Sequence, residues 1–338
     1  MRVGAGMLPG MSRHPWEPVA APPRGLVRPV PVDPTGTAGP TRGQAAGPHW
    51  RRTSPGLYVP AGTPCDVPEQ RILEQSARLP DGGAVTGWAA CRLAGAGLID
   101  GLAADRRTRL PVPLALGQHG RIRGDDRVVC LYDALGPAEV TVRYGIRTTR
   151  VLRAAFDAVR LAGDDREAVV VLDMMAAARL ISLQQMREYV VLRAGSPGVA
   201  AARRALAWAS EHSRSPNESR LRLVWYLDAG LPVVRVNCPV HDRRGRLLGI
   251  ADLLDEEAGL VVEFDGADHR RAGRHTDDVR REDGFRRHGL EVARVTGLDL
   301  RDGVQRVVDR LRAARRRSRF EPVERRPWVA RPVDVRRW

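Results

Sequence analysis

The chain has 338 residues, a formal charge of +15 and a pI near 11.0, and arginine is its only basic residue apart from eight histidines. This length accommodates two domains or three. No apolar run approaches about 18 residues and no signal-peptide pattern begins the chain, so the composition predicts a cytoplasmic protein and excludes a membrane-spanning one.

The absence of lysine bears on the partner. The planar guanidinium fork of arginine matches the oxygens of a phosphate group bidentately, so a strongly basic chain of this kind predicts a nucleic-acid partner. The alternative is compositional, since arginine in place of lysine with abundant Ala, Gly and Val is also typical of a GC-rich genome. The four cysteines are far apart and form no C-x-x-C pair, which favours reduced thiols over disulfides or a zinc site.

Residues 1–45 are rich in Pro, Gly and Arg and have few large apolar groups. Such a segment cannot bury enough surface to offset the entropy of ordering, so the sequence predicts a flexible leader. Order is expected from Trp50, because two short apolar pieces flank a Ser-Pro-Gly turn there. This pattern predicts a hairpin over 50–60, with a winged-helix wing and an ordinary surface hairpin as the two alternatives.

Residues 46–212 are predicted to form a mixed α+β region that is a candidate for DNA recognition. Asp157 and Asp173 are isolated acids in apolar helical runs, where a cap or a buried hydrogen bond explains them better than catalysis. We expect strands near 112–116, 128–132 and 140–143, and helices near 67–78, after Thr86, and near 152–160, 168–178, 182–192 and 199–210.

Residues 213–316 carry the clearest pattern. Ser215-Pro216-Asn217-Glu218 has the spacing of a capping box with Pro at the first helical position, and an apolar helical face follows as far as Gly230. The order αβββαβα predicts an α/β domain, followed by a basic flexible tail over 317–338. Its expected strands are 233–240, 247–254, 260–264 and 290–295, and its later helices are 276–288 and a closing helix that includes 304–311.

Two of these strands carry three carboxylates around an acidic turn. Asp252 interrupts the first strand, and Glu263 and Asp265 stand two apart on the second, so both point to one face. A turn over 256–259 would place Asp252 opposite Glu263. Because an unpaired charge is costly to bury in a strand, converging carboxylates indicate a divalent cation, and oxygen ligands suit Mg²⁺ or Mn²⁺.

Two further side chains complete the predicted site. Glu218 begins the preceding helix and could be a third carboxylate ligand, although the capping box alone also explains it. His269 follows the acidic strand and could act as a general base or hold the attacking water. The predicted catalytic residues are therefore Glu218, Asp252, Glu263, Asp265 and His269, with Glu218, Asp252 and Glu263 as metal ligands.

The architecture and spacing resemble the PD-(D/E)xK superfamily of restriction-endonuclease-like nucleases. Ala251-Asp252 matches the PD step, Glu263-Phe264-Asp265 matches the (D/E)xK step, and the string Glu-x-Asp-Gly-x-x-His that ends at His269 resembles the very-short-patch-repair-like branch. From Trp50 onward the chain also resembles actinobacterial proteins that carry this domain. Residues 50–210 resemble, more weakly, the antitoxin of abortive-infection type IV toxin–antitoxin systems. The resemblance implies a Mg²⁺-dependent endonuclease that hydrolyses DNA.

The chain departs from this family at the motif lysine, which is absent and has no lysine elsewhere to replace it. Asp265 occupies its position. In the resembling family the lysine is thought to orient or activate the attacking water, a task that would pass to His269 or to a second metal held by Asp265. The very-short-patch-repair-like branch lacks this lysine as well, and Ala251 in place of the motif proline leaves the Asp252 ligand intact.

Three functions stay open at the level of sequence. The first is metal-dependent cleavage of DNA, which predicts that Asp252→Ala abolishes cutting. The second is a non-catalytic DNA-binding regulator, antitoxin-like, that uses the nuclease fold as a scaffold and keeps its binding in Asp252→Ala and Glu263→Ala. The third is a structural carboxylate cluster in a domain without a nucleic-acid function.

Overall fold

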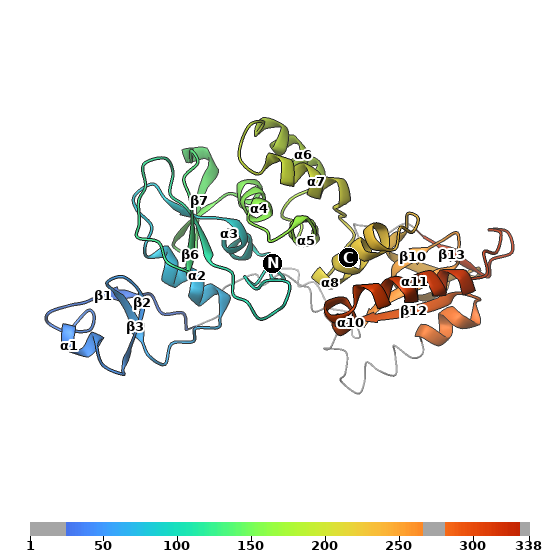
Figure 1. The fold of residues 1–338 in the computed structure, drawn as a ribbon, viewed down its shortest axis with the longest axis horizontal. Helices are drawn as coiled ribbons and strands as arrows, with labels where there is room; N and C mark the ends of the chain where they lie inside the picture. Colours follow the sequence, from blue (N-terminus) through green and yellow to red (C-terminus); the bar gives the residue numbers. More distant parts are fainter. Residues whose placement is uncertain (1–24, 266–280, 332–338) are drawn as a thin grey trace, which may run out of the picture.

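The computed structural model of the chain describes residues 25–265 and 281–331 and has the mixed α/β fold that the sequence predicts. Its elements follow one another along the long axis of the molecule, from a small sheet at one end to the C-terminal sheet at the other (Figure 1). Within the described ranges no helix has the length and apolar composition needed to cross a membrane.

The small sheet contains strands β1 (Val30–Pro31), β2 (Trp50–Ser54) and β3 (Leu57–Pro60) in the order β1-β3-β2, and the short helix α1 (Arg42–Ala45) lies beside it. The hairpin predicted over 50–60 is confirmed, and Gly56 closes its turn with a φ of 77°.

The leader predicted over 1–45 is wrong for residues 25–45. Strand β1 pairs with β3, so part of this segment belongs to the small sheet. The Gln70 side chain also holds the backbone of Val27 through two hydrogen bonds, of 2.9 and 2.8 Å. These backbone contacts compensate for the few apolar groups in the segment.

The middle of the chain packs helices against a five-stranded sheet of order β6-β5-β4-β8-β7. Phe156, Leu172 and Met175 are fully buried in its core. The strands are β4 (Ala84–Val85), β5 (Val112–Ala115), β6 (Val128–Leu131), β7 (Val140–Arg143) and β8 (Ile146–Thr149). The helices are α2 (Pro68–Ser76), α3 (Gly87–Ala94), the 3₁₀ turn η1 (Pro137–Glu139), α4 (Val151–Arg160), α5 (Asp165–Ala177), α6 (Leu183–Leu192) and α7 (Val199–Trp208). The elements predicted for this region are confirmed to within a few residues at their ends.

The C-terminal sheet has five strands in the order β12-β11-β10-β9-β13, and only the β11–β12 pair is parallel. The predicted order of elements is present, with α10 and β13 in addition, and the start of the helix predicted at 276 lies outside the described residues. In chain order the elements are α8 (Pro216–Leu223), the π-helical turn η2 (Val224–Asp228), β9 (Arg235–Asp242), β10 (Leu247–Asp255), β11 (Leu260–Asp265), helical residues 281–287, β12 (Glu291–Thr296), α10 (Gly297–Asp302), α11 (Val304–Arg317) and β13 (Trp328–Ala330).

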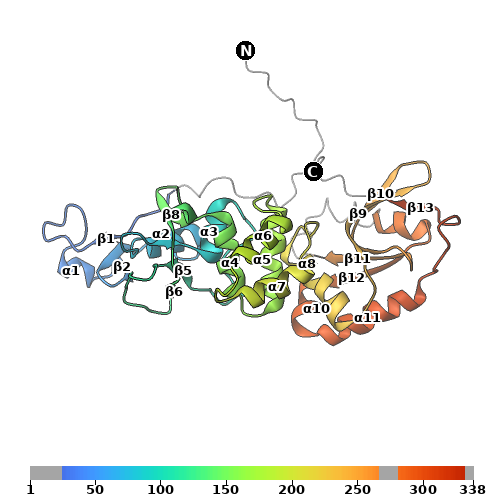
Figure 2. The same cartoon turned by 90° about the horizontal axis from the view of Figure 1, so that it is seen from above.

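Apolar layers cover both faces of this sheet. On one face, Trp225 of η2 and Leu311 of α11 pack against β9–β12. On the other, Phe285 and Trp328 pack against the same strands. Figure 2 shows the sheet between α11 on one side and helical residues 281–287 on the other. The strands are therefore buried on both faces, which makes any carboxylate in their middle exceptional.

The acidic turn has the predicted length and register. Strand β10 ends at Asp255 and β11 begins at Leu260, so the turn covers residues 256–259, and Gly259 adopts a φ of 74°. Leu253 pairs with Val262, and this register places the next residues, Asp252 and Glu263, side by side.

The flexible tail predicted over 317–338 is wrong for residues 317–331. Strand β13 pairs with the outer edge of β9 and extends the sheet. Trp328 is buried, the Arg326 guanidinium lies 5.2 Å from the centre of its ring, and Arg243 donates to the carbonyl of Arg326 at 2.6 Å. The composition of the segment is that of a solvated tail, but a single tryptophan and paired backbone groups are enough to fix it to the sheet.

Helix α8 is held to α5 by buried polar contacts. The Asp173 carboxylate of α5 accepts hydrogen bonds from the Ser219 hydroxyl at 2.6 Å, from Arg222 at 2.7 Å and from the backbone N–H of Ser210 at 2.7 Å. The prediction that Asp173 has a structural role is thereby confirmed. Because these contacts hold α8 against α5, they also set the position of the residues in the first turn of α8.

Candidate active site

Glu218 lies in the first turn of α8 and is held by two neighbours. Its backbone N–H donates to the hydroxyl of Ser215 at 3.2 Å, as the capping-box spacing predicts. Its carboxylate Oε2 accepts from the backbone N–H of Arg214 at 2.9 Å and from the side-chain amide of Asn237 at 2.7 Å. The Ser215 half of the predicted capping box is therefore present, but the Glu218 carboxylate contacts the Arg214 N–H and strand β9 instead of the Ser215 N–H.

Asn237 marks a kink in β9 and β10. It has a φ of 48° within β9, a left-handed conformation that asparagine tolerates better than other residues with a side chain. Residues two apart on a strand normally share a face, yet Val236 and Cys238 pack in opposite apolar layers. The flanking pairs of β9 with β10 place Asn237 across from Asp252. The β9–β10 register is unbroken at this point, so the change of face gives the polar side chains positions outside both apolar layers without a bulge.

Asp252 sits at the same kink on β10. Its carboxylate accepts the backbone N–H of Phe264 at 2.8 Å, which orients the group between β10 and β11. Ala251 and Leu253 on either side pack into opposite apolar layers, so the strand changes face at this residue. The side chain is partly buried.

Glu263 is buried on β11 and lies beside arginine. The Arg281 guanidinium approaches its carboxylate with Nε at 3.2 Å from Oε1 and a terminal nitrogen at 3.3 Å from Oε2. On β12, Arg294 is the residue opposite Glu263 in the β11–β12 register, and its side chain forms an ion pair with Glu282 at 2.5 Å. A polar row therefore crosses four strands, made by Asn237, Asp252, Glu263 and Arg294.

The electrostatics show that the carboxylates act on one another. Burial raises the pKa of Asp252 well above its ordinary value, and the negative charges of Glu218 and Glu263 raise it further. The Phe264 N–H and the positive charge of Arg281 oppose this rise. Burial also lowers the pKa of Arg214, while the negative charges of Glu218 and Asp252 act to raise that pKa. Three carboxylates and two guanidinium groups thus share one polar centre.

The other two predicted site residues are not placed in this centre. Asp265 is the last residue of β11 and is exposed, with Thr296 as its partner on β12. His269 lies outside the described residues, so its predicted role stays a prediction. Of the five predicted catalytic residues, Asp252 and Glu263 are neighbours in the β10–β11 register, and the charges of Glu218 and Glu263 both act on Asp252.

Sequence reasoning missed Asn237, Arg214 and Arg281. Asn237 has a signal that could have found it, because it is a polar residue between Val236 and Cys238 in the middle of the strand predicted over 233–240. The two arginines have none, since arginine is frequent throughout the chain and only the fold selects those that lie beside the carboxylates.

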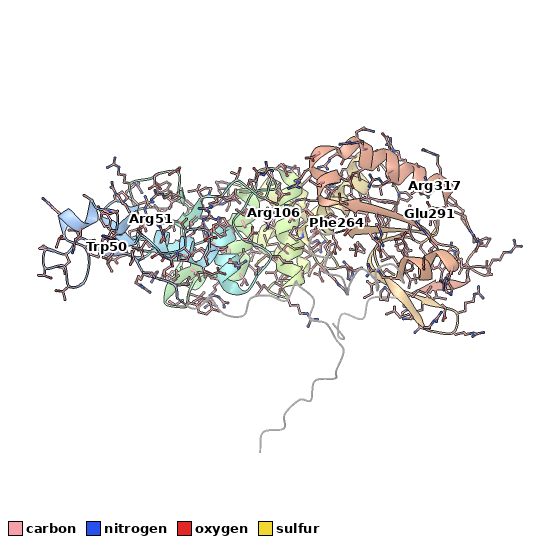
Figure 3. The ribbon with its side chains drawn as sticks, turned by 90° about the horizontal axis from the view of Figure 1, so that it is seen from below. Trp50, Arg51, Arg106, Phe264, Glu291 and Arg317 are labelled. Carbon is pink, nitrogen blue, oxygen red and sulfur yellow. The ribbon has the colours of Figure 1, made fainter. Side chains whose placement is uncertain are left out.

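The site lies where the C-terminal sheet meets the rest of the chain. Phe264, next to Glu263, is at the end of β11 that points toward helices α5 and α7, whereas Glu291 and Arg317 lie toward the outer end of the molecule (Figure 3). Comparisons with protein-family models, curated proteins and solved structures found no match for this chain. Among residues 25–265 and 281–331, no three His, Cys, Asp or Glu side chains are already gathered as a metal site.

Proposed function

We propose that the chain is a divalent-metal-dependent endonuclease that hydrolyses phosphodiester bonds in DNA, with Glu218, Asp252 and Glu263 as ligands for Mg²⁺ or Mn²⁺. The observation that carries the proposal is geometric: Asp252 lies beside Glu263 in the β10–β11 register and across from Asn237, which holds Glu218, within a sheet that is apolar on both faces. The resemblance of this stretch to the PD-(D/E)xK superfamily supports the same reading.

The donor set fits a hard cation. Carboxylate oxygens from a helix and two strands are the ligands that Mg²⁺ and Mn²⁺ prefer, and a bound cation would offset the repulsion that raises the pKa of Asp252. Arg281 now contributes positive charge beside Glu263, so ligation by Glu263 requires its carboxylate to exchange part of that contact. When bound, the cation would supply an activated water and stabilise charge on the phosphate.

The chain's own residues have separate tasks in this proposal. Asn237 orients Glu218, and the Phe264 N–H orients Asp252. Arg214 and Arg281 bring positive charge to a site that a phosphate diester would approach. The water-positioning task that belongs to the lysine in the resembling family would pass to His269 or to a second metal held by Asp265. The charge of +15 favours association with DNA.

Cleavage assays on supercoiled and linear DNA test the proposal. We expect the wild-type chain to cut in Mg²⁺ or Mn²⁺ and not in EDTA, and Asp252→Asn to cut at least about 100-fold more slowly because a ligand is lost. Asp309→Asn, on an exposed carboxylate of α11, is the matched control and should cut like wild type. A pure wild-type preparation that cuts no form of DNA with either metal rejects the proposal.

Thermal stability gives a second readout that does not depend on cleavage. A ligand that binds only the folded state stabilises it by about 1.4 kcal/mol at ten times its Kd. We therefore expect Mg²⁺ to raise the Tm of wild type and of Asp309→Asn in a saturable way, and to leave the Tm of Asp252→Asn nearly unchanged. Equal shifts in all three proteins would show that Mg²⁺ acts elsewhere.

A further inference from the structure

A cavity of about 880 Å³ opens beside the carboxylate site. Its walls come from the end of α7, the η2 turn, the segment that leads into β9, and Arg331 beyond β13. This volume lies in the range of small-molecule and cofactor pockets, about 300–1,000 Å³.

An aromatic pair forms one wall of the cavity. The rings of Trp208 and Tyr226 lie 5.9 Å apart between their centres, inclined by 34°. The Tyr226 hydroxyl accepts the backbone N–H of Val234 at 3.2 Å, which fixes its ring, and the Trp208 carbonyl accepts from Arg222 at 2.6 Å, which fixes its backbone. Trp208 nevertheless keeps 41 % of its surface exposed, which leaves ring area for a ligand.

The charge of the lining is positive. Arg235 and Arg331 are exposed among the residues that line the cavity, and the lining residues within 25–265 and 281–331 include no Asp or Glu. Arg235 forms an ion pair with Glu256 at 2.6 Å, but both partners are substantially exposed, and such pairs are weak enough to exchange for a phosphate.

Asn237 connects this cavity to the carboxylate site. Its side-chain amide donates to the carbonyl of His212, which lines the cavity, at 2.8 Å, and to Glu218 at 2.7 Å. Val236 and Cys238 on either side also line the cavity. One residue of β9 therefore separates the two sites.

We propose that this cavity binds an unpaired nucleotide of a DNA strand whose neighbouring phosphate lies at the carboxylate site. Every base has an aromatic face that can stack on Trp208, and Arg235 and Arg331 can hold phosphates on either side. A base inside a duplex already stacks on its neighbours and cannot enter. The inference rests on the proposed function and narrows its substrate to single-stranded or locally unpaired DNA.

Binding without cleavage tests the inference. Fluorescence anisotropy in EDTA compares a labelled single-stranded oligonucleotide with its fully paired duplex, using full-length Asp252→Asn as the parent protein. We expect the further change Trp208→Ala to weaken single-strand binding about 5- to 150-fold, as for loss of one stacked base, and to leave duplex binding unchanged. Trp208→Phe should restore most of the affinity, because a ring remains.

Two further variants keep the result interpretable. Trp50→Ala removes an equal aromatic area in the small sheet near one end of the molecule (Figure 3), away from the cavity, and should bind like the parent. Val233→Glu places a negative charge at a cavity residue that is 86 % exposed, so it should fold normally and weaken single-strand binding. Unchanged affinity in both Trp208→Ala and Val233→Glu overturns the inference.

The same set separates this inference from the proposed function. If wild type does not cut DNA but single-strand binding depends on Trp208, the nuclease proposal fails and the nucleotide site stands. If wild type cuts DNA and Trp208→Ala neither binds nor cuts differently, the nucleotide site fails and the nuclease proposal stands.

Discussion

Asn237 links the kink in the sheet to the geometry of the carboxylates. It is buried, its φ is positive, and its amide donates to two acceptors, the Glu218 carboxylate and the His212 carbonyl. An apolar residue at this position would leave both acceptors without this donor, and most residues would also strain the backbone. This asparagine therefore both adopts the left-handed backbone conformation and supplies the hydrogen bonds to Glu218 and His212.

Two substitutions separate these roles. Asn237→Gly keeps the left-handed backbone and removes the amide, whereas Asn237→Ala removes the amide and adds strain. We expect both variants to cut DNA at least about 10-fold more slowly, since a hydrogen bond to a charged group contributes about 1.5–3 kcal/mol. The free energy of unfolding of Asn237→Ala, measured by urea titration, should also be about 1 kcal/mol lower than that of Asn237→Gly. Full activity in the glycine variant would show that Glu218 does not need this contact.

At the scale of elements, α10 shows how a short helix is fixed beside the site. The Asp299 carboxylate accepts from the backbone N–H of Thr296 at 2.9 Å and from Arg310 of α11 at 3.0 and 3.2 Å. Arg310 and the Thr296 N–H lower the pKa of Asp299 from 3.8 to about 2. The carboxylate therefore joins β12, α10 and α11 as long as it is ionised.

This pKa sets the direction of a pH effect. Because the folded-state pKa is below the unfolded value, the stabilisation is complete above about pH 4 and is lost as pH falls through about 2. We expect Asp299→Ala to reduce the free energy of unfolding near neutral pH by about 1 kcal/mol, and the difference from wild type to shrink toward pH 2. Urea titrations at pH values of about 7, 4 and 2 measure it.

Arg310→Gln is the companion variant for this effect. It removes the largest cause of the lowered pKa and should reproduce most of the pH-dependent part of the loss. A difference between wild type and Asp299→Ala that stays constant across this range would contradict the assignment.

At the scale of the whole molecule, a buried ion pair joins the C-terminal sheet region to the helices before it. Asp173 and Arg222 are both almost fully inaccessible, and burial raises the pKa of the Asp173 carboxyl while the charge of Arg222 opposes the rise. A pair of this kind adds little net stability over apolar residues, but breaking one half leaves an uncompensated group. The contact therefore fixes the orientation of α8, and with it Glu218, relative to α5.

We expect Arg222→Ala to reduce the free energy of unfolding by about 3–5 kcal/mol, because Asp173 is left buried without its partner. The matched control is Arg204→Ala, which breaks an exposed pair with Asp165 between α7 and α5 and should unfold like wild type. Guanidinium unfolding of the three proteins measures the effect. Similar losses in both variants would show that burial does not decide the strength of the pair.

Much of the fold could be predicted because periodic apolar residues report burial directly. The helices from 67 to 210, the strands β5, β6 and β7, the hairpin at 50–60 and the acidic turn at 256–259 were predicted from such patterns and from turn residues, whereas the short strands β4 and β8 were not. The predictions of flexible segments failed where only a few residues hold a segment to the rest of the protein. Residues 25–45 and 317–331 are held by backbone pairing and by single side chains such as Gln70 and Trp328, and composition averages these out.

The sequence by itself determined the α/β architecture, the positive net charge and the carboxylate-bearing strands, because each depends on residue type and on the spacing of residues close in the chain. The tertiary structure alone decided that the charge of Glu218 on α8 acts on Asp252, that Asn237 of β9 holds Glu218, and that Arg214 and Arg281 lie beside the carboxylates. These contacts join residues far apart in the chain. Their strength depends on burial and on the direction of each side chain, which appear only when the elements pack.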